Sequence, residues 1–163
     1  MKTHFLPFLF CLLVSLSLRA QISKTVTITT PGTLSTFFTN SEQASVTNLT
    51  ISGNIDARDM AFVRDKLKVL SVINLSAAKI SLYVGTAGTY AGISLVYPAN
   101  ELPMYSFYNA NTNKFKPSLT SVTLPATITS IGYLAFYYCW NITGTFSIPA
   151  SVKKIGDYAL YGC

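Results

Sequence analysis

The chain has 163 residues, of which 50% are hydrophobic and 11% charged, and its formal net charge is +6. The lysines are spread along the chain, so the sequence lacks the concentrated basic stripe of a nucleic-acid-binding protein. After residue 20, no stretch approaches the roughly 18 consecutive apolar residues that a membrane span needs.

Residues 1–20 are typical of a secretory signal peptide. A short basic start precedes a mainly apolar run over residues 5–18, and Ala20 supplies a small residue where cleavage would occur. The apolar run is short for a membrane span. We therefore predict a secreted or cell-surface protein whose mature part, residues 21–163, is about the size of one domain.

Residues 21–66 are predicted to form an N-terminal cap and a first repeat-like unit. Val26 and Ile28 alternate with threonines, which favours a strand over residues 25–29. A second strand is expected over residues 46–52, where apolar residues recur in the same way. The cap should therefore begin with strands that face a core on one side.

A helix is predicted over residues 57–67. Asp56 is a good N-cap residue, and Asp59 stands at the third helical position, where an acidic side chain can complete a capping box. We interpret this pair of carboxylates as the start of a helix rather than as catalytic groups.

Residues 67–118 are predicted to hold degenerate repeats. A strand is expected over residues 70–76. The glycine-rich stretch 82–97 interrupts the repeat pattern and is expected to end in a further strand. Residues 102–107 then match residues 131–136, with a proline in place of a glycine. A weak repeat copy therefore precedes the clear ones.

Residues 119–163 contain one pattern twice, over residues 124–139 and 148–163. Equivalent residues stand 24 positions apart: Pro125 and Pro149, Ile131 and Ile155, Gly132 and Gly156, Ala135 and Ala159, and Cys139 and Cys163. A fixed period of this length is typical of an array in which each unit buries its apolar face against its neighbours.

The pattern resembles the BspA-like class of leucine-rich repeats. An apolar strand ending in Leu-Pro or Ile-Pro is followed by Ile-Gly, then by Ala-Phe or Ala-Leu, and finally by Cys. The resemblance implies an α/β leucine-rich repeat solenoid with short parallel strands on its concave face, here with an N-terminal strand–helix cap. It also implies a surface antigen of anaerobic bacteria, a class associated with adhesion to host matrix proteins and with coaggregation. No binding residue can be carried over from the family, because the motif is structural.

Stacking of the repeats places alternate strand residues on opposite faces. We predict that the outward residues form a hydroxyl-lined concave binding face, made of Thr50, Ser52, Asn74, Ser76, Ser121, Thr123, Thr145 and Ser147. Gly132 and Gly156 are each expected to serve a tight turn with positive φ.

The sequence offers little for catalysis. The one histidine, His4, lies in the predicted signal peptide, so the mature chain lacks the base of a Ser-His-Asp or Cys-His site and the usual zinc ligands. We predict that the protein is not an enzyme and takes no metal or cofactor. The alternative, a carboxylate pair of a glycan hydrolase, has no support in the spacing of the acids.

Cys139 and Cys163 stand one repeat apart, within reach of a disulfide. Parallel side chains in a stack suit free, buried thiols better, and this is the state we expect. A cluster of aromatic residues in the same repeats is predicted to pack outside the strands or, where exposed, to form a contact surface: Tyr133, Tyr137, Tyr138, Trp140, Tyr158 and Tyr161.

The expected function is that of an adhesin-like module binding an extracellular protein or glycan, without nucleic acid as a partner. The alternative is a structural spacer or self-assembly module of a larger surface protein. No polar cap comes after the last repeat, so we expect either a truncated chain or self-association through the C-terminal edge.

Overall fold

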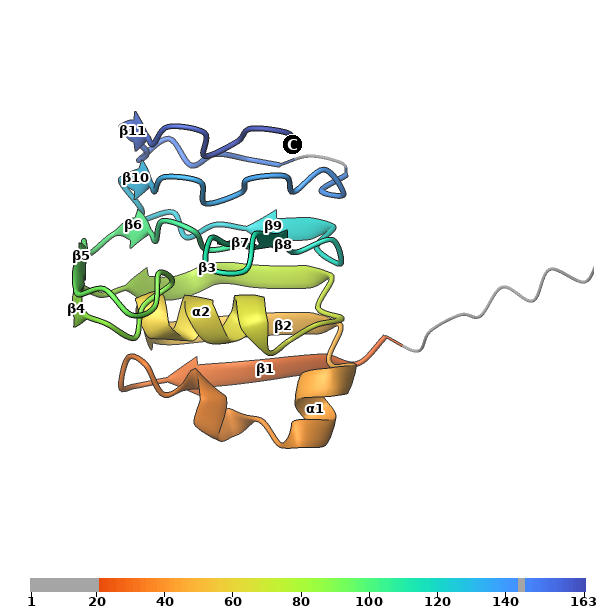
Figure 1. The fold of residues 1–163 in the computed structure, drawn as a ribbon. Helices are drawn as coiled ribbons and strands as arrows, with labels where there is room; N and C mark the ends of the chain where they lie inside the picture. Colours follow the sequence, from red (N-terminus) through yellow and green to blue (C-terminus); the bar gives the residue numbers. More distant parts are fainter. Residues whose placement is uncertain (1–20, 144–145) are drawn as a thin grey trace, which may run out of the picture.

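The structure, a computed structural model, describes residues 21–143 and 146–163, and the predicted signal peptide lies outside this part. The elements in chain order (Figure 1) are β1 (Ser23–Ile28), a 3-10 helix η1 (Leu34–Phe37), α1 (Asn40–Ser45), β2 (Asn48–Ile55), α2 (Ala57–Asp65), β3 (Val72–Ile80), β4 (Tyr83–Gly85), β5 (Leu95–Tyr97), β6 (Glu101–Leu102), β7 (Tyr108–Asn109), β8 (Lys114–Phe115), β9 (Ser121–Thr123), β10 (Ser130–Ile131) and β11 (Lys154–Ile155). The chain is an α/β repeat protein whose successive turns lie on one another in sequence order.

The first sheet has the strand order β1-β2-β3-β9, and all its neighbouring strands are parallel. Leu49 of β2, Ile73 of β3 and Val122 of β9 are in register, and all three are buried. Because side chains alternate along a strand, these residues share the face that carries the core. The expected parallel pairing of the early repeat strands is confirmed.

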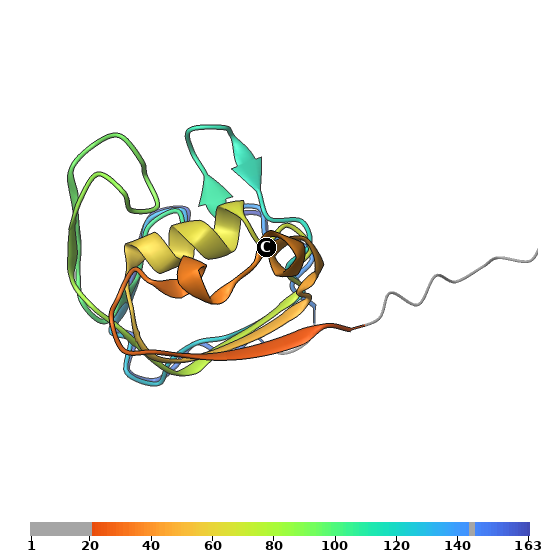
Figure 2. The same ribbon diagram turned by 90° about the horizontal axis from the view of Figure 1, so that it is seen from below.

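Helix α2 packs on the inner face of this sheet together with η1 (Figure 2). Its start is a capping box: the Asp56 side chain accepts from the helix backbone, and the Asp59 side chain accepts from the Asp56 amide at 2.9 Å. The predicted cap is thus confirmed. Helix α1, which we did not predict, begins with a second box between Thr39 and Glu42.

The second stack consists of two-residue strands in the order β11-β10-β6, again parallel. Leu102, Ile131 and Ile155 are in register across it, so both repeat alignments made from the sequence are confirmed. The turns are joined by backbone hydrogen bonds such as the amide of Gly156 to the carbonyl of Ile131, at 2.8 Å.

The expectation for Gly132 and Gly156 was wrong. Neither has a positive φ, and the left-handed residues of the repeats include Tyr105 (φ 59°), Leu134 (φ 53°), Tyr138 (φ 54°) and Tyr158 (φ 55°). A Cβ on Gly132 would lie 2.4 Å from the Met104 amide nitrogen, inside contact distance. Glycine is therefore required by the close approach of the neighbouring turn.

The predicted return of stretch 82–97 as a strand is confirmed by β5, but two loops contain pairings that we did not predict. Stretch 82–97 contains an antiparallel pair, β4 and β5, and the loop after Phe107 contains a second pair, β7 and β8. The repeat pattern predicted a strand that ends at Ile148 and Pro149, but among the described residues no strand lies between β10 and β11, and Phe146 belongs to none. Its ring instead packs on Phe136, with the ring centroids 5.0 Å apart.

Candidate functional site

Helix α2 and η1 lie on one side of the first sheet (Figure 2). The opposite side carries mainly polar side chains. In β1, Val26 and Ile28 are buried against the core, while Thr25 and Thr27 are exposed. We call this side the outer face; its polar members are Ser23, Thr25, Thr27, Asn48, Thr50, Ser52, Asn54, Asn74, Lys79, Ser121 and Thr123.

One row of the outer face crosses all four strands. The register aligns Thr25 of β1 with Thr50, Asn74 and Thr123 of the next three strands. Parallel strands lie about 4.8 Å apart, so this row is a regular ladder of hydroxyl and amide groups. In a second row, the hydroxyl oxygens of Thr27 and Ser52 lie 2.8 Å apart in a hydrogen bond. The sheet thus brings polar groups that are distant in sequence into one line.

Ser76 lies outside these rows. The register between β2 and β3 shifts, so Ser52 faces Ala77 rather than Ser76, and the Ser76 amide donates to the Asn74 side chain at 2.9 Å. A β-bulge inserts an extra residue into one strand and shifts the pairing of the residues after it. The row that contains Ser121 includes an apolar residue, because its partner on β3 is Val72.

The last repeat contributes less than expected to the outer face. Thr145 lies outside the described residues. Ser147 is exposed but belongs to none of the described strands. It lines, with Thr123 and Pro149, a hollow of about 300 Å³ next to β9. The structure therefore places Ser147 near the edge of the outer face and not in one of its rows.

Sequence reasoning missed the part of the outer face that β1 supplies. Thr25 and Thr27 were part of a predicted strand, but that strand was interpreted only as a cap. Their alternation with Val26 and Ile28 was the signal that could have identified them, because it is the same parity that selected Thr50 and Ser52.

The aromatic residues form two columns along the stacked turns. In one, Tyr105 packs on Tyr133 at 5.5 Å between ring centroids, and Tyr133 on Tyr158 at 6.4 Å. The other joins the rings of Tyr108, Tyr137 and Tyr161, at 4.9 and 5.4 Å between neighbours. Large parts of several rings are exposed, namely those of Tyr133, Trp140, Tyr158 and Tyr161. The columns therefore both pack the turns together and offer a rigid aromatic surface.

Cys139 and Cys163 are free thiols, as expected, but only one of them is buried. Cys139 is buried, and this burial raises the pKa of its thiol to about 12. Cys163 is exposed, and its sulfur lies 3.2 Å from the carbonyl oxygen of Phe136. Because a high pKa keeps a thiol protonated, Cys139 is a poor nucleophile.

The buried acids of the cap serve the fold. Asp59 accepts hydrogen bonds from the amides of Gly32, at 2.7 Å, and of Leu34, at 2.9 Å, as well as from Asp56. Burial raises the pKa of Asp59, and these donors act in the opposite direction. Within residues 21–143 and 146–163, no three His, Cys, Asp or Glu side chains are grouped as a metal site requires.

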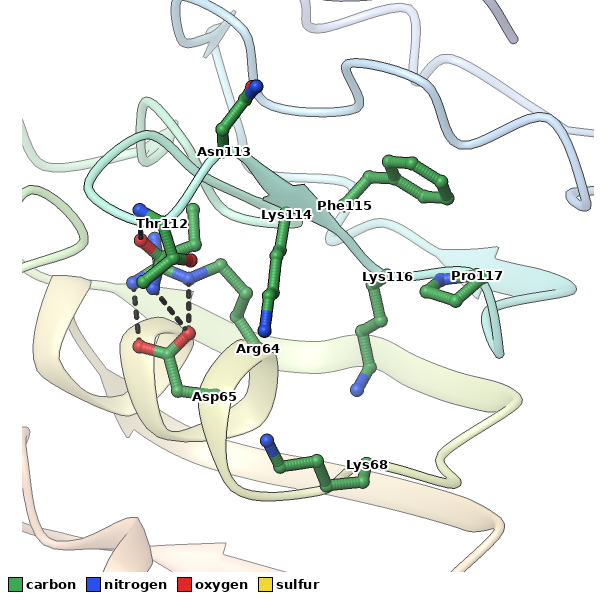
Figure 3. Close-up of a pocket in the computed structure, with 10 residues that line it drawn as sticks. Arg64, Asp65, Lys68, Thr112, Asn113, Lys114, Phe115, Lys116 and Pro117 are labelled. Carbon is green, nitrogen blue, oxygen red and sulfur yellow. Dashed lines mark hydrogen bonds and ion pairs between the residues drawn. The ribbon is translucent and has the colours of Figure 1, made fainter.

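A further hollow, which no sequence pattern indicated, lies between the C-terminal part of α2 and the β7–β8 hairpin (Figure 3). Its volume is about 560 Å³, and its lining includes the basic residues Arg64, Lys68, Lys114 and Lys116 and the acid Asp65. We call it the hairpin hollow. It could not be predicted because it depends on the unexpected hairpin, which brings residues 109–117 over the helix.

The family comparison matches residues 100–163 to the BspA type leucine rich repeat region, in 6 copies. The matched segment begins just before β6 and includes both aromatic columns. No curated protein matches the chain significantly. Over the described part of the chain, none of the helices is long and apolar enough to span a membrane.

Proposed function

Because residues 100–163 belong to the BspA-type leucine-rich repeat family, we propose that this protein is a secreted or cell-surface solenoid that binds an extracellular protein or glycan. In this proposal the contact surface is the outer face of the sheet, and the protein has no catalytic role. Repeat proteins of this kind bind partners along extended surfaces.

The ladder of Thr25, Thr50, Asn74 and Thr123 is the observation that carries the proposal. Its groups are neutral, short and held by parallel strands, so they lose little side-chain entropy when they bind. They offer donors and acceptors at a regular spacing, which suits the hydroxyls of a glycan or the polar groups of a protein surface. The low fraction of charged residues, 11%, fits a neutral contact surface.

The test is an array of glycans and extracellular matrix proteins probed with residues 21–163 and with two outer-face variants, Thr50→Arg and Thr123→Arg. A bulky charge in the ladder should weaken binding at least about tenfold by excluding the ligand. Ser35→Arg is the matched control, because Ser35 is exposed on η1, at the opposite side of the sheet. Equal binding by all three variants would show that the outer face is not the contact surface.

A second candidate is a structural or self-assembly role, favoured by the exposed edge of the last repeat. β11 pairs only with β10 among the described strands, and Ile155 is 46% exposed although its equivalent Ile131 is buried. A further repeat-like unit from another copy could cover this edge. Sedimentation over a range of concentrations should then show association that Ile155→Glu abolishes, and a concentration-independent monomer would contradict this role.

A further inference from the structure

The hairpin hollow contains more positive than negative charge. Among its lining residues, Arg64, Lys68, Lys114 and Lys116 face a single acid, Asp65. The described part of the chain holds three ion pairs, and none of them involves a lysine of the hollow. The lysine charges are therefore not neutralised by carboxylates of the fold.

Arg64 and Asp65 form an ion pair with each other. The Arg64 guanidinium donates to both Asp65 oxygens, at 2.8 and 2.7 Å, and also to the carbonyls of Thr89, at 2.6 Å, and Tyr105, at 2.9 Å. The Asn109 amide donates to Asp65 at 2.8 Å. Although burial raises the pKa of Asp65, these hydrogen bonds outweigh it and hold the pKa below its ordinary value. An incoming anion would therefore meet the lysines and not a free arginine fork.

Of these charged groups, Lys116 has the most unfavourable environment. It is buried, and its ammonium donates to one protein acceptor, the Leu67 carbonyl, although it carries three N–H groups. Burial lowers its pKa to about 8, Asp65 acts in the opposite direction, and Lys68 adds repulsion. The nearby Cys139 thiol is neutral at this pH, because its pKa is about 12. Asp65 forms no direct ion pair with Lys116, so the buried ammonium remains costly, and a bound anion would reduce that cost.

The three ammonium groups are directed toward the same space. Figure 3 shows the side chains of Lys68, Lys114 and Lys116 reaching into the gap between the hairpin and the end of α2. This convergence suits one compact anionic group, because an extended acidic peptide would need cations spaced along a line. The hollow, at about 560 Å³, is also far larger than an inorganic anion and falls in the range of small-ligand sites.

The rest of the lining is suited to hydroxyl groups. Thr112 lies exposed at the tip of the hairpin and lines the hollow with a hydroxyl group. The Asn113 side chain is directed away from the lysines (Figure 3), and its oxygen accepts from the Tyr108 hydroxyl. Phe115 and Pro117 add apolar surface. The Phe115 ring also packs on Trp140, with the ring centroids 4.6 Å apart, so the polar contacts of the lining are the lysines and Thr112. A small ligand with one negative charge and hydroxyl groups matches this set.

We propose that the hairpin hollow is a binding site for a saccharide unit that carries a carboxylate or sulfate group, held by the ammonium groups of Lys68, Lys114 and Lys116. The site is separate from the outer face, and its existence does not depend on the function proposed for that face.

The experiment is a titration of the protein, followed by NMR or calorimetry, with methyl β-D-glucuronide, with glucose 6-sulfate and with the neutral methyl β-D-glucoside. We expect saturable binding of a charged sugar, at least about tenfold tighter than that of the neutral one. Lys68→Gln combined with Lys114→Gln should weaken it about tenfold or more. The control, Lys153→Gln with Lys154→Gln, removes the same charge from exposed positions and should bind like the parent.

Titrations with two further compounds decide which class of ligand the hairpin hollow binds. If inorganic sulfate binds as tightly as the charged sugars, the hollow takes an adventitious ion only and the proposal is wrong. If a tetraglutamate peptide binds while the charged sugars do not, the site recognises acidic peptides and the proposal is also wrong. Binding of the sugars should decline as the pH rises above about 8, where Lys116 loses its proton. The variant Thr50→Arg should leave sugar binding unchanged, which separates this test from that of the outer face.

Discussion

The N-terminal and C-terminal halves stack their turns by different means. In the first half, strands of 6, 8 and 9 residues form one sheet, which the three-residue β9 of the second half extends, and α2 covers its inner face (Figure 2). In the second half, the strands β6, β10 and β11 have only two residues each, glycines allow neighbouring turns to approach closely, and aromatic columns pack along the turns. A sheet covered by a helix gains most of its stability from the burial of apolar side chains. The stability of the short stacked turns depends on how closely one backbone approaches the next.

An inner repeat and the last repeat also differ, in how deeply equivalent side chains are buried. Ile131 has a neighbour on each side, Leu102 and Ile155, and is 1% exposed, whereas Ile155 is 46% exposed. Identical residues at equivalent positions of one repeat thus differ in what they contribute. The position in the stack, and not the motif, sets the burial.

The largest expected effect is that of Ile131→Ala. Truncating this buried side chain should lower the free energy of unfolding by about 2–5 kcal/mol. Ile155→Ala should cost less than about 1 kcal/mol, because much of that side chain is already in water. Urea unfolding of both variants tests the contrast, and equal losses would mean that the last repeat is as well covered as the inner one.

Asp59→Ala tests the cap of the first half. It removes the acceptor of three backbone amides, those of Gly32, Leu34 and Asp56. We expect a loss of about 3 kcal/mol, since each orphaned donor costs roughly 1–3 kcal/mol and some are rehydrated. Asp157→Ala, at an exposed position of the second half, should change stability by no more than about 0.5 kcal/mol. If Asp59→Ala unfolded at the parent's urea midpoint, the capping network would not stabilise the fold.

Gly132→Ala tests the close approach of turns in the second half. Its methyl group would collide with the backbone of Met104, so we expect a loss of about 1–3 kcal/mol. Hydrogen exchange should accelerate at the amides of Gly132 and Tyr105, which cross between turns, and not in β1 to β3. Gly92→Ala is the control, because nothing lies within 4 Å of its Cβ position. It should leave those amides protected, despite the strain of its positive φ.

The smallest effect concerns the pH dependence of the cap at α1. A hydrogen bond from Lys24, at 2.5 Å, and further bonds with Thr39 lower the pKa of Glu42 from 4.5 to about 2. Because the folded-state pKa is lowered, this contribution is fully present above about pH 4.5 and is lost as the pH falls toward 2. Comparing the unfolding of the parent and Glu42→Gln across this range should show a difference that disappears in acid. A constant difference down to pH 2 would contradict the pairing.

Periodicity and capping chemistry were enough to predict much of the fold. The 24-residue repeat fixes the register of Ile131 and Ile155, because stacked units place equivalent residues side by side. Asp56 and Asp59 predicted the start of α2, since a cap depends on residues close in sequence. Strand parity predicted which side Thr50 and Thr123 occupy, although whether this side binds a ligand stays a prediction.

The features that were missed depend on contacts between turns. The bulge that displaces Ser76 arises from pairing with β2, and the need for glycine at Gly132 arises from the approach of Met104. Neither is visible in the local sequence. The β7–β8 hairpin consists of two residues on each strand, too short for an alternation to show. The hairpin hollow, which depends on that hairpin, was therefore beyond sequence reasoning.

The stacking of turns in register underlies both proposed surfaces, and NMR on the protein tests it most directly. We predict cross-turn NOEs between Ile131 and Ile155, together with slow exchange of the Gly132 and Gly156 amides, which donate to Leu102 and Ile131. Absence of these NOEs, with exchange of both amides at the rate of an unfolded chain, would contradict the account.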